Sequence, residues 1–138
     1  MVNSTTFLSS YTRYDVLGNI VSVKDARGNL ATISYLDDFG DGSSPGFNSS
    51  GHSSYALPTR ITSPPPNPTE AQHIAYTQFD YSTGLLTGFK DRNGVITQTI
   101  YNDPFDRPTL INVALGSTVE SHTRMRIKSR EEQISSEL

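Results

Sequence analysis

Aspartates recur at regular places in this chain, and their spacing raises the question of acid–base chemistry. Asp15, Asp25 and Asp91 each stand three residues before a glycine, and Asp80 stands four residues before one. Two carboxylates can divide the roles of general acid and general base when a positioned partner separates their pKa values. These aspartates have no such partner nearby in sequence, and a fixed distance to glycine is typical of turn capping. The spacing predicts structural aspartates, no catalytic residue and no enzyme.

A calcium site is the second chemistry that the residue types suggest. The run Asp37–Gly42 holds three aspartates and two glycines. An EF-hand loop needs a glutamate at its twelfth position, where this sequence has Asn48. His52, His73 and His122 lack metal-ligand spacing, and the chain has no cysteine. We therefore expect a solvated loop at Asp37–Gly42, and neither a metal nor a cofactor.

Charge and composition narrow the classes of partner. The net charge is −3, whereas nucleic-acid binders usually carry a basic face, so we expect no nucleic-acid partner. No apolar run approaches the roughly 20 residues that span a bilayer, and residues 1–20 lack a signal-peptide pattern. Hydrophobic residues are 34% of the chain with Tyr included. Exchanging Tyr for Gly leaves the fraction well below the roughly 45–50% of typical domains, which predicts a thin core.

Two short turns organise the elements around these aspartates. In Asp25–Gly28 and Asp91–Gly94, the aspartate can accept bonds from the backbone ahead of it, and the glycine can adopt a positive φ. Such a turn is a common hairpin connection, and the flanking runs are rich in β-branched residues. The pattern predicts two antiparallel hairpins, which pair Ile20–Lys24 with Leu30–Tyr35 and Leu85–Lys90 with Val95–Tyr101.

The two hairpins belong to a duplicated stretch. Tyr14–Tyr35 and Phe79–Tyr101 match at a constant separation of 66 positions (25 to 91, for example). The opening aromatic alone is displaced by one, which implies one extra residue between Asp80 and Gly84. The repeat positions are Tyr14, Asp15, Gly18, Asp25, Gly28, Tyr35, Phe79, Asp80, Gly84, Asp91, Gly94 and Tyr101. Repeats bury apolar surface by stacking on their neighbours, so each hairpin is expected to need its sibling.

The chain divides into four regions by composition. Residues 1–36 hold the first repeat, 37–73 a Gly/Ser/Pro-rich spacer, 74–113 the second repeat and the start of a third, and 114–138 a polar tail. Within the spacer, Leu57–Thr62 is expected to form a short strand at a sheet edge, because Pro58 has no N–H to donate. The tail is expected to be disordered or helical.

A basic cluster in the tail leaves two interpretations open. Arg124, Arg126, Lys128 and Arg130 stand close together, and two glutamates follow them. The cluster could touch an anionic surface, or it could belong to a solvated tail, which we favour.

The repeated residues resemble the YD repeat of the RHS family. That repeat has a Tyr-Asp pair, a glycine about three residues later, an apolar run, an Asp-x-x-Gly turn and a strand into the next Tyr-Asp. The match covers about Tyr11–Leu36 and Ile74–Ile111. The departures are Phe79 for the first Tyr of the second copy, Asn102 for Asp after Tyr101, and a third copy that stops before its turn.

The resemblance implies a fold and a role. Similar proteins coil mainly β, antiparallel hairpins into a hollow β-shell that encloses a polypeptide cargo, and some are toxin-related. The chain would then be a non-catalytic wall segment and a fragment of a larger protein. Its partners would be neighbouring YD repeats, or further copies joined through open strand edges. The parent would sit at a bacterial cell surface or be secreted, although the sequence does not give the localisation of this chain.

The repeated aromatics support an alternative role. Carbohydrate binding has been attributed to some members of the RHS family, and rings such as Tyr14 and Phe79 could stack on sugars. A carbohydrate-binding surface module is therefore the second hypothesis. Repeated aromatics more often pack between neighbouring hairpins, so we expect packing at Tyr14, Tyr35, Phe79 and Tyr101.

Overall fold

The computed structural model describes residues 8–37, 53–67 and 69–125, and these residues form strands and turns without a helix. The chain therefore has the mainly β, antiparallel fold that the hairpin signals predict. The nine strands are β1 (Tyr11–Tyr14), β2 (Ile20–Lys24), β3 (Leu30–Ser34), β4 (Arg60–Ser63), β5 (His73–Phe79), β6 (Leu86–Lys90), β7 (Ile96–Ile100), β8 (Leu110–Val113) and β9 (Ser121–Arg124).

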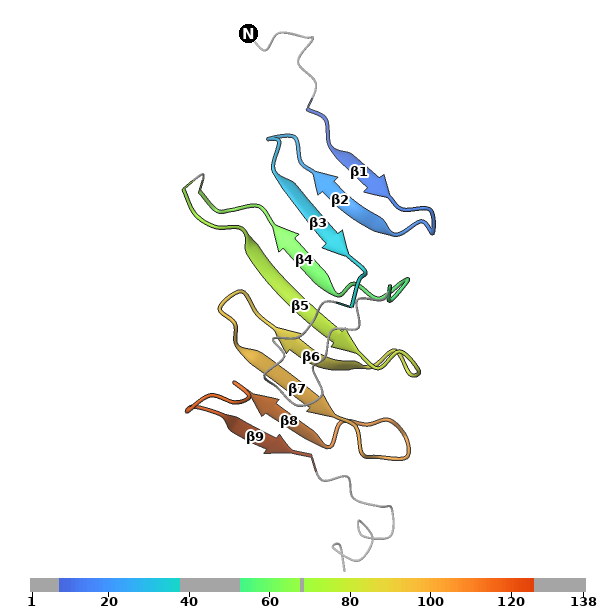
Figure 1. Ribbon diagram of the computed structural model, residues 1–138, viewed down its shortest axis with the longest axis vertical. Coiled ribbons are helices and arrows are strands. Elements are labelled where there is room, and N and C mark those ends of the chain that lie inside the picture. The colour runs from blue at the N-terminus through green and yellow to red at the C-terminus, as the bar shows by residue number, and fades with distance from the viewer. Residues whose placement is uncertain (1–7, 38–52, 68, 126–138) are drawn as a thin grey trace, which may run out of the picture.

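The strands form one open sheet with the simplest possible order. Each strand pairs antiparallel with the next along the chain, from β1 at one edge to β9 at the other. Figure 1 shows the strands following one another along the long axis of the molecule as a single layer. Among the described residues, neither β1 nor β9 has a strand on its outer side, so the sheet has two open edges.

Both predicted hairpins are confirmed. β2 pairs with β3 through Lys24 and Leu30, and β6 pairs with β7 through Lys90 and Ile96. The register also repeats outside the hairpins, because β1–β2 and β5–β6 carry the same irregularity, between Arg13 and Tyr14 and between Gln78 and Phe79. The sheet is thus built from a four-strand unit, β1–β4, that recurs as β5–β8.

The expected strand in the spacer exists, but its predicted place at an edge is wrong. β4 lies between β3 and β5 and pairs with both. Pro58 precedes the strand, so its missing N–H removes no bond from the ladder. The spacer therefore does not interrupt the array, because β4 carries the sheet from the first repeat into the second.

The expectation of a disordered or helical tail is wrong for the part that the structure describes. Ser121–Arg124 forms β9, which pairs with β8 along its whole length. His122 Nδ1 lies 2.9 Å from Asn112 Oδ1, and Met125 N–H donates to Thr109 O at 2.9 Å. Residues 126–138, including most of the basic cluster, lie outside the described residues.

The core is as thin as the composition predicts. Within the described ranges, Ile96 is the one buried hydrophobic side chain, and Tyr76 and Leu115 pack against it. The single fully enclosed side chain there is polar, since Thr59 is 0% exposed. Many large hydrophobic side chains of the described residues stay exposed, so hydrogen bonds carry much of the architecture of the sheet.

Candidate functional site

The candidate acid of the first hairpin turn, Asp25, accepts hydrogen bonds from the backbone of that turn. Asp25 Oδ1 accepts hydrogen bonds from the N–H groups of Arg27, at 2.8 Å, and Asn29, at 2.9 Å. Gly28 follows with a φ of 91°, which a side chain would oppose. The Asn29 amide donates to the other carboxylate oxygen at 2.8 Å. That side-chain bond, with the backbone bonds, holds the pKa of Asp25 below its ordinary value.

The second hairpin turn repeats this geometry. Asp91 Oδ1 accepts from the N–H groups of Asn93, at 2.8 Å, and Val95, at 2.9 Å, and Gly94 has a φ of 81°. Val95 stands where the first turn has Asn29, so the amide-to-carboxylate bond is absent from this copy. The backbone shape is therefore set by the aspartate and the glycine alone.

The other two aspartates lie in the turns at the opposite ends of the strands. Asp15 Oδ1 accepts from Leu17 N–H at 2.8 Å and Asn19 N–H at 2.9 Å. Asp80 Oδ1 accepts from Ser82 N–H at 2.8 Å. Asp15 N–H donates to Asn19 O, whereas Asp80 N–H donates to Leu85 O, one position further along. The extra residue in the second copy therefore lies inside this turn, where it lengthens the loop without altering the strands.

The repeat glycines of these two turns both have a positive φ. Gly18 has a φ of 87° and Gly84 a φ of 74°. Asn19 also holds the Asp15 carboxylate, with its amide nitrogen 3.0 Å from Oδ2, and this bond is the main cause of the lowered pKa of Asp15. All four repeat aspartates thus lie at turns along the two ends of the strands, with their oxygens directed to local N–H groups.

Two of the repeated tyrosines clasp their own hairpins. Tyr35 donates its hydroxyl to Ile20 O at 3.1 Å, and Tyr101 donates to Leu86 O at 3.0 Å. Each bond reaches back to the first residue of the preceding strand. Phe79 is half-buried, whereas Tyr14 on the edge strand is 60% exposed. The rings of Tyr35, Tyr101 and Phe79 are therefore part of the packed sheet, and Tyr14 is the one repeat aromatic that is open to a ligand.

A threonine anchor was missed by the sequence analysis. Thr59 donates its N–H to Ser34 O at 2.9 Å, and its hydroxyl reaches Ser34 O and Leu36 O. Thr109 repeats the anchor, since its N–H and its hydroxyl lie 2.8 Å and 3.0 Å from Ile100 O. The signal was present as Pro-Thr-x-Ile at 58–61 and at 108–111. This anchor fixes where β4 and β8 begin.

The third Tyr-Asp-like segment is stabilised by an ion pair. Asp103 accepts Phe105 N–H at 2.9 Å, and the Arg107 guanidinium grips both carboxylate oxygens, through Nε at 2.8 Å and Nη2 at 2.9 Å. The bond from Arg107 is the main cause of the lowered pKa of Asp103. Arg107 also lies 5.1 Å from the centre of the Phe105 ring. These contacts close the β7–β8 connection.

Asp37, which we expected in a solvated loop, is buried. Its exposure is 6%, and it interacts with the Tyr81 hydroxyl. Burial, with the nearby Asp37 charge second, raises the pKa of Tyr81 to about 12. The Tyr81 hydroxyl stays protonated at neutral pH, and its interaction with Asp37 joins the β5–β6 turn to the segment that follows β3. The rest of the candidate calcium run, 38–42, lies outside the described residues, as does His52.

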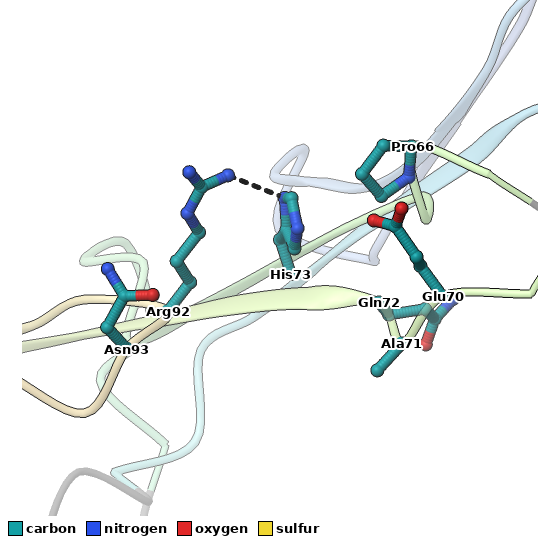
Figure 2. Close-up of a pocket in the computed structure, with 7 residues that line it drawn as sticks. All are labelled: Pro66, Glu70, Ala71, Gln72, His73, Arg92 and Asn93. Carbon is teal, nitrogen blue, oxygen red and sulfur yellow. Dashed lines mark hydrogen bonds between the residues drawn. The ribbon is translucent and has the colours of Figure 1, made fainter.

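Two adjoining hollows are found where β4 and β5 meet the β6–β7 turn. The first, of about 600 Å³, lies among Pro66, Glu70, His73 and Arg92. Figure 2 shows Arg92 pointing towards His73, and its Nη1 lies 3.2 Å from His73 Nδ1. The second, of about 480 Å³, has Ile61, Ala75 and Phe89 along its floor and walls. Among the residues described at the two hollows, the Ser63 hydroxyl is not hydrogen-bonded to His73, whose Nδ1 faces Arg92 instead.

The described parts of the chain contain neither a candidate metal-binding group nor a candidate membrane-spanning helix. No group of three or more His, Asp or Glu residues there is arranged to hold a metal ion. Nor does any segment of residues 8–37, 53–67 or 69–125 form a helix with the length and apolar character needed to cross a membrane. What the arrangement does offer is surface, in the form of two open edges and two unlike faces.

The faces of the sheet differ in charge. The register places every Lys and Arg of the described strands on one face, which we call the basic face: Arg13, Lys24, Arg60, Lys90 and Arg124. The opposite face carries no Lys, Arg, Asp or Glu of any described strand, and we call it the uncharged face. The acidic residues of the described ranges all lie in turns and connections.

In comparisons with known proteins, no protein-family model and no curated protein matches the chain.

Proposed function

We propose that this chain is a non-catalytic structural and interaction segment of the RHS/YD-repeat kind, and that it forms part of the wall of a β-shell. The observation that carries the proposal is the recurrence of a four-strand unit within one sheet. Asp caps, Tyr clasps and Thr anchors occupy equivalent places in both copies. Such an array can continue in either direction, because each unit presents the edge that the next one covers.

The open edges support this role. The side chains of β1 and β9 are exposed throughout, and an edge strand presents unpaired N–H and C=O groups to any strand that approaches it. The proposed partners are neighbouring YD repeats of a longer chain, or further copies of this chain joined edge to edge. By the same resemblance, the parent protein would act at a bacterial cell surface or after secretion.

Thr12 provides a direct test of the β1 edge. Asp25 N–H donates to Asn29 O, so alternation along β2 turns Val23 N–H towards β3 and leaves Thr12, opposite Val23, with its N–H directed to the open edge. We expect association that rises with concentration without a fixed stoichiometry, because contacts between unlike edges do not close. Thr12→Pro removes the outward donor and should stop this growth, whereas Thr12→Ala retains it and should not.

Sedimentation velocity over a range of concentrations measures both variants. A chain that never grows beyond a fixed small assembly, or growth that Thr12→Pro leaves unchanged, would contradict the edge role.

Carbohydrate binding remains the second candidate, and one observation favours it. Tyr11 and Tyr14 on β1 are 64% and 60% exposed, and exposed rings can stack on sugars. If the chain is a carbohydrate-binding module, it should be a monomer that is retained on immobilised glycans. Tyr14→Ala should then abolish retention, while Tyr35→Ala, at a ring that clasps the hairpin, should act through stability instead.

A further inference from the structure

The uncharged face is the starting point, and it is independent of the proposed wall function. Residues that face one another across antiparallel strands lie on the same side of the sheet, so the register assigns each strand residue to a face. The apolar part of the uncharged face is carried by Val23, Ile33, Ile61, Phe89, Ile111 and Val113. Four of them, Val23, Ile61, Phe89 and Val113, remain 37–41% exposed.

The two faces cannot be covered in the same way. A dry layer on the basic face would remove water from the five Lys and Arg side chains there, which weighs against such a layer. The uncharged face carries no such cost, and each apolar side chain buried there contributes favourably. The single buried hydrophobic residue of the described ranges, Ile96, lies on the basic face beside Lys90, so the uncharged face has no core of its own.

We propose that the uncharged face packs against the same face of a second copy of this chain, as a two-layer β-sandwich related by a twofold axis. Stacked sheets pack about 10 Å apart through interdigitating side chains. A twofold interface must be self-complementary, and this face holds a projection next to a hollow. Phe89 stands beside the hollow of about 480 Å³ over Ala75, so each copy can place its Phe89 in the hollow of the other.

The area of the face suits a dimer. The nine strands, at a spacing of about 4.8 Å and with a rise of about 3.4 Å per residue, give a face of roughly 600 Å² in each copy. Two such faces bury roughly 1,200 Å², which is the lower limit of a standard specific interface. A second copy brings the same face, whose described strands carry no Lys, Arg, Asp or Glu. The charged residues at the hollow are Asp91 and Arg92 of the β6–β7 turn, and His73 also lies on this face.

A pair of adjacent substitutions in β4 tests the proposal. Ile61 lies on the uncharged face and Thr62 on the basic face. In sedimentation equilibrium of the full chain, with the edge blocked by Thr12→Pro, we expect a closed dimer. Ile61→Lys should raise the dissociation constant at least tenfold, and Thr62→Lys should leave it within about twofold. Circular dichroism checks that both variants keep the sheet.

Thiol protection gives a second measurement that does not add a charge. The chain has no cysteine, so one introduced thiol reports on its own surroundings. Ala75→Cys, on the uncharged face, should become less reactive towards a thiol reagent as the dimer forms, because Phe89 of the second copy covers it, and Ile74→Cys, on the basic face of the same strand, should not.

A Thr12→Pro chain that is monomeric at all concentrations would overturn the dimer and leave the edge role untouched. Equal effects of lysine at positions 61 and 62, or equal protection of cysteines at positions 74 and 75, would overturn it as well.

Discussion

The two four-strand units share their anchors but differ in the connection between them. Ser34 and Thr59, which start the anchor of β4, are 25 positions apart, whereas Ile100 and Thr109, which anchor β8, are only 9 apart. Nevertheless the threonine hydroxyl lies 3.0 Å from the strand carbonyl in both. The closing bonds of the unit therefore do not depend on the length of chain that they enclose.

This difference indicates that the four-strand unit is specified by the residues at the ends of each connection and not by the length of the connection. A longer loop costs only about 1 kcal/mol of additional closure entropy for such a change in length. The threonine N–H and hydroxyl bonds can offset a cost of that size. An insertion between β3 and β4 is consequently compatible with the sheet, provided that the residues at its two ends are retained.

The largest expected effect lies at these anchors. Thr59→Val should destabilise the fold by about 2 kcal/mol, because the fully enclosed hydroxyl serves the carbonyls of Ser34 and Leu36. Thr109→Val should cost about 1 kcal/mol, since that hydroxyl is less enclosed. Urea unfolding followed by circular dichroism measures both. Equal losses would show that the longer connection does not depend more strongly on its anchor.

The turn glycines should respond alike in the two units. Gly28 and Gly94 have φ values of 91° and 81°, and an added Cβ would meet no atom closer than 3.7 Å at either. Backbone strain alone should therefore cost Gly28→Ala and Gly94→Ala about 1–2 kcal/mol each. Asn tolerates this conformation better, so the matched Asn variants should recover part of the loss in the same urea titration. A loss of stability at only one of the two turns would show that the two copies do not depend equally on their turn glycines.

The tyrosine clasps provide a smaller comparison. Tyr35→Phe and Tyr101→Phe each remove one exposed hydroxyl bond and should destabilise the chain by about 0.5 kcal/mol. The chain has no Trp, so tyrosine fluorescence can follow unfolding, with circular dichroism as the reference. A double variant that loses much more than the two single variants together would indicate that the units are coupled.

Acid should weaken the fold gradually through the turn carboxylates. The folded pKa values of Asp15, Asp25 and Asp103 are lowered, so ionisation of these groups stabilises the folded chain. That stability is fully present above their ordinary value of 3.8 and is lost as pH falls through the lower folded pKa. Urea midpoints measured from about pH 5 downward should fall less steeply for Asp25→Asn, which keeps an acceptor oxygen but does not titrate. Parallel slopes would exclude a contribution from Asp25.

Local features of the fold follow from the sequence because their bonds are local. Asp25 bonds to backbone two and four positions ahead, and Gly28 needs only its own φ. The hairpins Ile20–Ser34 and Leu86–Ile100 close over those turns, so the residues that specify them are close in sequence.

The position of β4, the strand β9 and the separation of charge between the faces were decided by the tertiary structure. Thr59 bonds to a carbonyl 25 positions away, and β9 exists because β8 offers it a ladder and Asn112 a hydrogen-bond partner. The basic face emerges only when the register sets Arg60 beside Tyr76 and Tyr76 beside Lys90. Side-chain order along one strand gives the alternation, but only pairing between strands determines which residues share a face.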